Sequence, residues 1–304
     1  MSLISIRLSA SYQKRLVLDD LHLDLKPGEA VGLIGESGSG KSTLALALLR
    51  LLHLKGGSAS GWVLWKGRDL MQLPEKEMRA VRGREIALVL QSAATSLNPA
   101  LKIGTQFKEA WAAHTQDPWT VGRERAHELL AEVNLTSGED YFNRYPREIS
   151  IGQAQRVLIA LSLLHQPELL IADEPTSALD VITQREVLEL LNRLRREHGM
   201  ATLFISHDLL SVAAFCHRVA ILQNGKIVEQ GQTETIFENP SHPYTRQLIQ
   251  SLPERPKPVV DEDEEHDMTE SLATLARKVV SFPPVPDSQY HDTHVPKHQD
   301  TPAS

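Results

Sequence analysis

The segment GESGSGKS, from Gly35 to Ser42, has the residue types and spacing of a phosphate-binding P-loop. Its glycines let backbone N–H groups close around phosphate oxygens, and the start of a following helix adds about half a positive charge. Lys41 can reach the β- and γ-phosphates of a nucleotide, and the Ser42 hydroxyl can ligate Mg²⁺. A merely flexible Gly/Ser loop does not explain the lysine or the strand-then-helix context. The predicted nucleotide-binding residues here are Gly35, Glu36, Ser37, Gly38, Ser39, Gly40, Lys41, Ser42 and Thr43.

Two adjacent carboxylates end the apolar run ELLIADE, at Asp173 and Glu174. The carboxyl edge of a parallel sheet is where ligands bind in such folds. Asp173 is predicted to hold Mg²⁺ through water, and Glu174 to polarise the attacking water as a general base. Taken alone, the pair could equally cap the following turn. Beside a P-loop, the catalytic interpretation is favoured. The two motifs together predict a P-loop nucleoside triphosphatase (NTPase).

The surrounding elements must bring these motifs together. Apolar residues alternate like strands over the first 35 residues, and further strands alternate with helices from about residue 165 onward. This order predicts an α/β fold of the P-loop NTPase (RecA-like) class, with a parallel-sheet core and an antiparallel β subdomain. A block of helical periodicity predicts a helical subdomain at about residues 95–160. Asn224-Gly225 joins two apolar runs and predicts a hairpin turn.

Composition changes sharply after residue 252. Residues 253–304 carry 5 Lys+Arg against 11 Asp+Glu, a net of −6, whereas residues 1–252 carry 27 against 28, a net of −1. The acidic, Pro-rich tail is predicted to be disordered, and residues 1–252 to form the ATPase domain. A near-neutral body lacks the basic footprint of a nucleic-acid-binding protein. The single cysteine, Cys216, excludes an internal disulfide and fits a cytoplasmic compartment.

A further segment, ISIGQAQR, ends at Arg156 and lies shortly before ELLIADEPTSALD. It resembles the signature segment of ABC transporter ATPases. Across residues 3–250, six motifs follow the order of that family. The resemblance implies that Tyr12 stacks on adenine, that Gln91 is the Q-loop glutamine and a Mg²⁺ contact, and that His207 is the switch histidine. It also implies nucleotide contacts from Ser150, Gly152, Gln153 and, in the D-loop SALD, Asp180.

In that family the signature segment closes over ATP held by a second ATPase subunit. The departure in this chain is Ile151, which stands where the family has the first of two glycines. If the backbone there needs a positive φ, Ile151 is strained. If it is already helical, isoleucine is acceptable, because its helix propensity exceeds that of glycine by about half a kcal/mol. The apolar helical pattern that follows favours the second alternative and hence a working site.

Two finer features, TSLNP (Thr95 to Pro99) and HPYTRQL, resemble the oligopeptide, dipeptide and nickel importer branch. That resemblance implies a peripheral subunit on the cytoplasmic face of the inner membrane. Its implied ligands are ATP and Mg²⁺. Its implied partners are inner-membrane permeases, a second ATPase subunit of the same or a different chain, and indirectly a substrate-binding protein. No nucleic acid is expected. The cargo is open: peptides, nickel or a metal chelate all fit.

Two other functions stay open at this point. One is a soluble ABC ATPase that acts on ribosomes or DNA without transport. A single ATPase domain and a near-neutral body argue against it. The other is a weakly hydrolytic partner in an ATPase heterodimer, in which Ile151 has weakened the signature segment.

Overall fold

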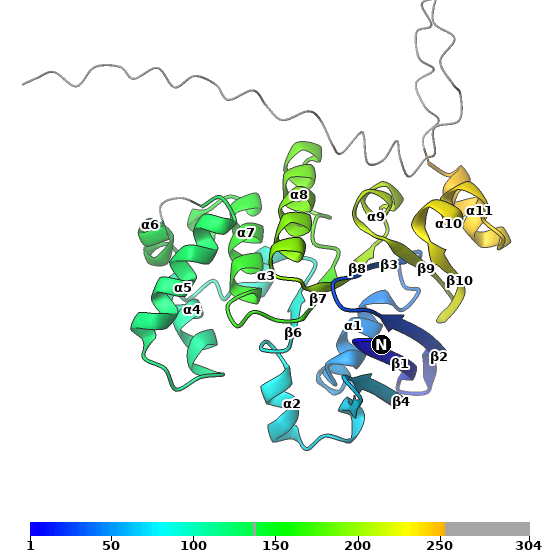
Figure 1. The fold of residues 1–304 in the computed structure, drawn as a ribbon, viewed down its shortest axis with the longest axis horizontal. Coiled ribbons are helices and arrows are strands. Elements are labelled where there is room, and N and C mark those ends of the chain that lie inside the picture. Colours follow the sequence, from blue (N-terminus) through cyan, green and yellow to red (C-terminus); the bar gives the residue numbers. More distant parts are fainter. Residues whose placement is uncertain (136–137, 253–304) are drawn as a thin grey trace, which may run out of the picture.

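The computed structural model describes residues 1–135 and 138–252, so the predicted tail lies outside the described residues. Two sheets form the frame of the described part (Figure 1). One has four antiparallel strands in the order β2-β1-β4-β5, and the other has six strands in the order β10-β9-β3-β8-β7-β6. The strands are β1 (Ile4–Tyr12), β2 (Arg15–Leu25), β3 (Ala30–Ile34), β4 (Gly57–Trp65), β5 (Arg68–Asp69), β6 (Ile86–Val89), β7 (Leu169–Asp173), β8 (Ala201–Ser206), β9 (Arg218–Gln223) and β10 (Lys226–Gln232).

Five of the six strands in the larger sheet run parallel, and only β10 pairs antiparallel, with β9. The parallel strands β6, β7 and β8 therefore end at the same edge, which is where the predicted catalytic residues follow them. This arrangement confirms the predicted fold class. In the order β9-β3-β8-β7-β6, neighbouring strands such as β3 and β8 are far apart in the sequence. This order was not predicted from the sequence.

Two hydrophobic cores cover opposite faces of the six-stranded sheet. Successive side chains of a strand point to opposite faces, so neighbours in sequence enter different cores. In β7, Leu169 and Ile171 enter the core shared with α1 and the antiparallel sheet, whereas Leu170 and Ala172 enter the core shared with α7 and α8. The continuous apolar run in this strand is thus explained by burial on both faces.

The helices cover both faces of the central sheet. In Figure 1, α8 and α9 lie above it, and α1 lies between it and the antiparallel sheet. Helices α3 to α7 occupy residues 93–162, and α4 to α7 gather at one end of the molecule. We interpret this group as the predicted helical subdomain. The helices are α1 (Lys41–Leu48), α2 (Glu75–Val81), α3 (Ala93–Ser96), α4 (Ile103–Ala112), α5 (Trp119–Glu132), α6 (Gly138–Asn143), α7 (Ile151–Ser162), α8 (Val181–Glu197), α9 (Leu209–Phe215), α10 (Thr233–Glu238) and α11 (Pro243–Gln250).

Two local features shape the β10-β9-β3 part of the core sheet, from which the P-loop leaves after β3. The predicted hairpin is confirmed: Asn224 and Gly225 join β9 to β10, both with positive φ, at 47° and 80°. On the other side, α9 packs so closely on β3 that a Cβ at Gly32 would lie 3.1 Å from Cys216 Sγ. Cys216 itself is buried, and burial raises the pKa of its thiol well above the ordinary value.

Candidate nucleotide site

The P-loop joins the end of β3 to the start of α1, as its motif predicts. Gly38 and Gly40 have φ values of 80° and 113°, which side-chain-bearing residues rarely adopt. Gly35 needs to be glycine for a different reason, since a Cβ there would lie 2.3 Å from the carbonyl oxygen of Leu222. Gly40 is also the residue that precedes the first turn of α1. The loop therefore presents the N-terminus of α1 toward the position of a bound phosphate.

Lys41 lies against its own loop. Its Nζ donates hydrogen bonds to the carbonyl oxygens of Gly35 at 2.7 Å and Glu36 at 3.0 Å. Burial lowers the pKa of this amine, while the nearby carboxylates of Glu174 and Asp173 act in the opposite direction.

Asp173 is 4% exposed at the end of β7. Burial raises the pKa of its carboxyl group, although a hydrogen bond from Ser42 acts against the rise. Within the described part of the chain, Asp173 Oδ1 is buried without a hydrogen-bond partner. An orphaned carboxylate oxygen beside a serine hydroxyl is the hard oxygen donor set that Mg²⁺ prefers. The residues present therefore fit the predicted metal.

Glu174 is the centre of a small polar network. Its Oε2 accepts a hydrogen bond of 2.8 Å from Gln91 Nε2, and its Oε1 lies 3.1 Å from His207 Nδ1. These three residues follow β7, β6 and β8 at one edge of the sheet. Glu174 has a φ of 49°, a left-handed conformation that costs energy for a residue with a side chain and that clusters at functional sites. Its N–H is fixed by the carbonyl of Ile205 at 2.8 Å.

The signature segment forms the first turn of α7. Ser150 is the residue that caps this helix: its Oγ accepts the N–H of Gln153 at 3.2 Å, and Gln153 Oε1 accepts the N–H of Ser150 at 3.0 Å. Ile151 is the first helical residue, is absent from the residues with positive φ, and is 55% exposed. The helical alternative predicted for Ile151 is thus confirmed, with no strain in its backbone.

The D-loop lies beside the signature segment. Asp180 caps α8 by accepting the N–H groups of Ile182 at 3.1 Å and Thr183 at 3.0 Å. The hydrogen bonds from Thr183 lower the pKa of this carboxyl group. A hollow of about 400 Å³ is lined by Ser150, Gly152 and Asp180 together. No P-loop residue is among the residues that line this hollow.

Gly152 contacts a neighbouring helix. A Cβ at this position would lie 2.9 Å from Thr183 Cγ2, at the start of α8. The sequence pattern predicted a close approach to phosphate and gave no sign of this contact. One residue type can meet both needs, because the missing side chain allows α7 and α8 to approach each other.

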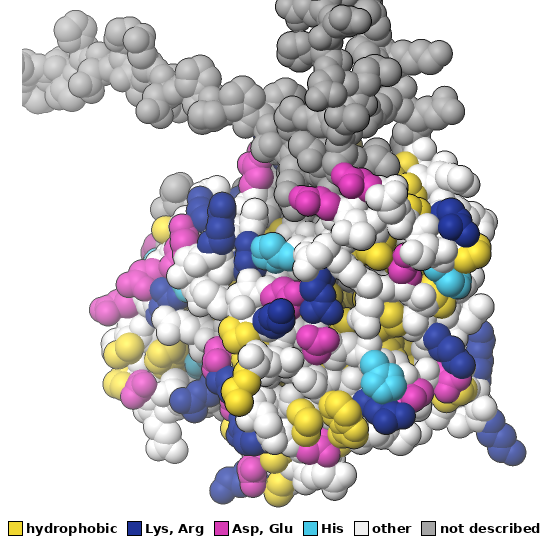
Figure 2. Space-filling model, turned by 45° about the vertical axis from the view of Figure 1, so that its right-hand side comes forward, with side chains coloured by type: hydrophobic (Ala, Val, Ile, Leu, Met, Phe, Trp, Pro, Cys, Tyr) yellow, Lys and Arg dark blue, Asp and Glu magenta, His cyan; other side chains and the backbone are white. Residues whose placement is uncertain are grey.

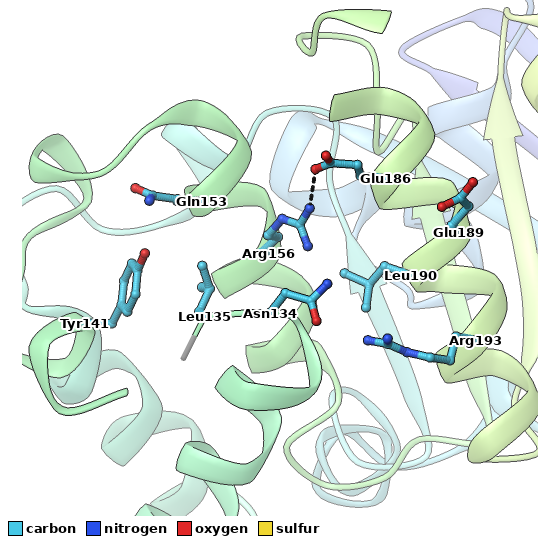
Figure 3. Close-up of a pocket in the computed structure, with 9 residues that line it drawn as sticks. All are labelled: Asn134, Leu135, Tyr141, Gln153, Arg156, Glu186, Glu189, Leu190 and Arg193. Atoms are coloured by element: carbon cyan, nitrogen blue, oxygen red, sulfur yellow. Dashed lines mark hydrogen bonds and ion pairs between the residues drawn. The ribbon is translucent and has the colours of Figure 1, made fainter. Parts of the chain in front are cut away.

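Arg156 ties α7 to α8. Its guanidinium forms an ion pair with Glu186 at 2.7 Å and donates to the carbonyl of Val133 at 3.0 Å. Figure 3 shows Arg156 pointing from α7 toward Glu186 across a pocket of about 640 Å³ that Tyr141 and Gln153 also line. Because the Arg156 side chain is only 11% exposed, we expect the pair to fix how the signature helix rests on α8.

Tyr12 ends β1, at the tip of the antiparallel sheet. It is half-buried, and a Cβ at Gly57 would lie 2.8 Å from its ring, so glycine makes room for the aromatic side chain. The hairpin that carries Tyr12 continues into β2, whose Val17 and Leu18 contact Gly40 of the P-loop. The structure therefore places the predicted adenine contact on an element that touches the P-loop.

The sequence analysis missed one residue at this site. Tyr244, in the HPYTRQL segment, accepts a hydrogen bond from the N–H of Glu36 at 3.2 Å. The two residues are 208 positions apart. Only the histidine, proline and tyrosine of the motif itself signalled that the segment matters, and they gave no indication of what it contacts.

The surface charge bears on the alternative function, an ATPase that acts on ribosomes or DNA. Figure 2 shows one face of the molecule, on which Lys and Arg side chains are interspersed with Asp and Glu. Mixed charge of this kind does not form the continuous basic stripe that nucleic acid requires. Within residues 1–135 and 138–252, no helix combines the length and hydropathy needed to cross a membrane.

Comparison with known proteins agrees with this geometry. A family model described as ABC transporter matches residues 18–177, which are 160 of the 304 residues. The chain belongs to the ABC transporter family. A second model, described as the C-terminal region of oligopeptide/dipeptide transporters, matches residues 228–273.

Individual relatives are consistent with the match. A peptidoglycan transport ATP-binding protein of Agrobacterium fabrum is 44% identical over 265 residues, which are 85% of this chain and 48% of that protein. The chain thus spans about half the length of this relative. A dipeptide transport ATP-binding protein of Escherichia coli is 40% identical over 237 residues, covering 78% of this chain and 72% of that protein.

Solved structures share the fold. A dimeric ATP-binding cassette in a post-hydrolysis state, bound to ADP and Pi, is 27% identical, with a TM-score of 0.66. The match covers 76% of this chain and 98% of that chain. Part of an ABC transporter complex from Clostridium perfringens is 25% identical, also with a TM-score of 0.66, over 83% of this chain and 96% of that chain.

Proposed function

We propose that this chain is the ATP-binding and ATP-hydrolysing subunit that energises a bacterial ABC importer of peptides or a related small solute. The observation that carries the proposal is the position of Glu174, which meets Gln91 and His207 at the strand edge close to Lys41 and Asp173. The names of the relatives, which include peptide and dipeptide transport, support the substrate class. Nickel or a metal chelate stays within the proposal.

The residues divide the work of hydrolysis. The P-loop amides and Lys41 bind the β- and γ-phosphates, and Tyr12 stacks on adenine. Ser42 and Asp173, with Gln91, would hold Mg²⁺, which supplies charge neutralisation at the phosphates. Glu174 accepts a proton from the attacking water. Gln91 and His207 orient the Glu174 carboxylate and the γ-phosphate that the water attacks. Their present contacts with Glu174 would have to rearrange for the water to enter.

A second subunit completes the site in this proposal. Ser150, Gly152, Gln153 and Asp180 lie around a hollow that the chain's own P-loop does not line. Ser150 caps a helix, so its hydroxyl and the first amides of α7 can face a γ-phosphate held by another chain. The dimeric state of the solved relative with ADP and Pi supports this arrangement.

The remaining partners follow from the family. The chain would lie on the cytoplasmic face of the inner membrane, bound to permeases, and would act indirectly with a substrate-binding protein. The helical end near Gln91 would pass the motion to the permeases. Of the alternatives, the ribosome- or DNA-acting ATPase gains no support from the mixed surface charge. The weakly hydrolytic partner loses its main argument, because Ile151 is helical and unstrained.

The test uses the Glu174→Gln variant. Removing the base should preserve ATP binding and slow hydrolysis by about a hundredfold or more. The tagged variant, held with Mg-ATP in mild detergent, should retain permeases from the native membrane. The same tagged variant prepared in Mg-ADP instead of Mg-ATP should contain fewer ATPase dimers.

Two results would contradict the proposal. Near-normal turnover in Glu174→Gln would remove Glu174 from its role as base. An eluate without membrane proteins, but with ribosomal or DNA-associated factors, would move the function to the soluble class.

A further inference from the structure

The HPYTR segment, residues 242–246, holds the side chain of Tyr244 in place through contacts at the start of α11. The carboxylate of Glu229, on β10, accepts the backbone N–H groups of Ser241 at 2.7 Å and His242 at 3.1 Å. His242 then caps α11, because its Nδ1 accepts the N–H of Tyr244 at 3.2 Å, and Pro243 takes the first helical position, where no N–H is needed. Glu229, His242 and Pro243 thus fix the start of the helix that carries Tyr244.

Tyr244 in turn reaches the P-loop. Its side chain is 5% exposed and packs in the core near Ile236 and Phe237. Its hydroxyl accepts the N–H of Glu36, the second residue of the P-loop. Burial raises the pKa of this phenol, so the group is neutral at physiological pH.

The contact matters because of which peptide it holds. The N–H of Glu36 and the carbonyl of Gly35 belong to one planar peptide unit, so fixing one end fixes the other. The Gly35 carbonyl is the acceptor that holds Lys41 Nζ at 2.7 Å. The next carbonyl, that of Glu36, accepts both Lys41 Nζ at 3.0 Å and the N–H of Ser39 at 3.2 Å. Tyr244 and Lys41 therefore form hydrogen bonds with opposite ends of the same peptide unit.

We propose that Tyr244 is a positioning residue for nucleotide binding. It orients the Gly35–Glu36 peptide and so links α11, the helix that follows His242, to the P-loop. This inference rests on the proposed function only in assuming that the P-loop binds nucleotide. A loop already held in one arrangement loses less conformational entropy when phosphate binds. Removing the hydroxyl therefore weakens binding, and leaves Glu174 and the chemical step unchanged.

The experiment is an equilibrium titration of the full chain with a fluorescent ATP analogue and Mg²⁺. Tyr244→Phe keeps the buried ring and removes one hydrogen bond, so the Kd should rise about fivefold. In the active complex, KM should rise by a similar factor with kcat within about twofold. Tyr141→Phe is the matched control, since Tyr141 is a tyrosine of 7% exposure in α6, and its Kd should not change.

Hydrogen exchange gives a direct readout of the same contact. In the nucleotide-free full chain, the peptide covering residues 33–40 should exchange faster in Tyr244→Phe than in wild type. A second variant avoids the core: Glu229→Ala releases the start of α11 and should raise the Kd in the same direction by about twofold.

The outcomes separate the two proposals. Failure of the wild-type chain to bind Mg-ATP overturns the proposed function itself. If the wild type binds, and Tyr244→Phe has a Kd within twofold of it with unchanged exchange at residues 33–40, Tyr244 has no positioning role. If Tyr244→Phe does not fold, an unchanged Kd in Glu229→Ala overturns the inference.

Discussion

At the scale of single residues, the site holds its charged groups in a restrained state. Lys41 is bound to loop carbonyls and Glu174 to Gln91. Asp173 is buried with one oxygen unpartnered. We therefore expect the buried carboxyl group of Asp173, with its unpartnered oxygen, to lower the stability of the nucleotide-free chain.

The cost at Asp173 can be measured. The unfolded chain ionises Asp173 at its ordinary pKa of 3.8, whereas the folded chain keeps the proton to higher pH because the group is buried. Ionisation therefore destabilises the folded state as pH rises above 3.8, through the range in which the folded chain gives up this proton. Asp173→Asn should raise the unfolding temperature of the nucleotide-free chain at pH 7 by about 1–3 °C.

The pH dependence and the metal serve as controls. The gain in unfolding temperature should shrink as pH falls below 3.8, the ordinary pKa, because Asp173 is then increasingly protonated in both the folded and the unfolded state. The same variant should lose the Mg²⁺-dependent part of ATP affinity. A variant that is less stable than wild type at pH 7 would show that Asp173 is not penalised by burial.

At the scale of elements, the first turn of α7 decides how the signature segment works. Its capping box satisfies the helix start without help from residue 151, and the Ile151 side chain points into solvent. The ion pair between Arg156 and Glu186 links the same helix to α8. The turn is thus built as a rigid helix end, whatever side chain follows Ser150.

Ile151→Gly should therefore change little. We expect ATP turnover of the complex with its permeases to stay within about threefold of wild type, with a stability loss of about half a kcal/mol from helix propensity. Val181→Gly is the matched control, because Val181 is the exposed, β-branched first residue of α8. A gain of tenfold or more in Ile151→Gly alone would show that isoleucine had weakened the site.

Elements also show how far the sequence could predict the structure. The strands of the antiparallel sheet followed from alternation, and buried strands such as β7 followed from continuous apolar runs. The hairpin at Asn224-Gly225 followed from two residues that tolerate positive φ. The contact of Tyr244 with Glu36 could not be predicted, because nothing local to either residue encodes a partner 208 positions away. The Gly152 contact with Thr183 was hidden for a related reason, since helix packing depends on the crossing of two elements rather than on either alone.

At the scale of the whole molecule, the predicted catalytic residues and the predicted signature and D-loop residues line two separate hollows. Glu174 and His207 line one hollow, and Ser150 and Asp180 line another. In the proposed function, a second ATPase subunit brings its P-loop to the hollow at Ser150 and Asp180. The approach of that subunit would then be coupled to a permease.

Association should therefore depend on nucleotide. Purified Glu174→Gln should have twice the 33.9 kDa chain mass in Mg-ATP and the monomer mass in Mg-ADP, when measured by mass photometry or light scattering. Lys41→Ala in the same background should stay monomeric, because the phosphates are no longer held. A monomer in Mg-ATP would contradict self-association, and a different ATPase chain would then be the partner.

The packing of α9 on β3 has a practical consequence. The chain has a single cysteine, and its thiol is buried against Gly32 with a raised pKa. Maleimides and spin labels react with the thiolate, so at neutral pH the native thiol is a poor target. Cysteines introduced on exposed positions can be labelled selectively in the otherwise native chain. A pair of such labels, one beside the P-loop and one beside Ser150, would serve as a spectroscopic ruler for the closing of two subunits.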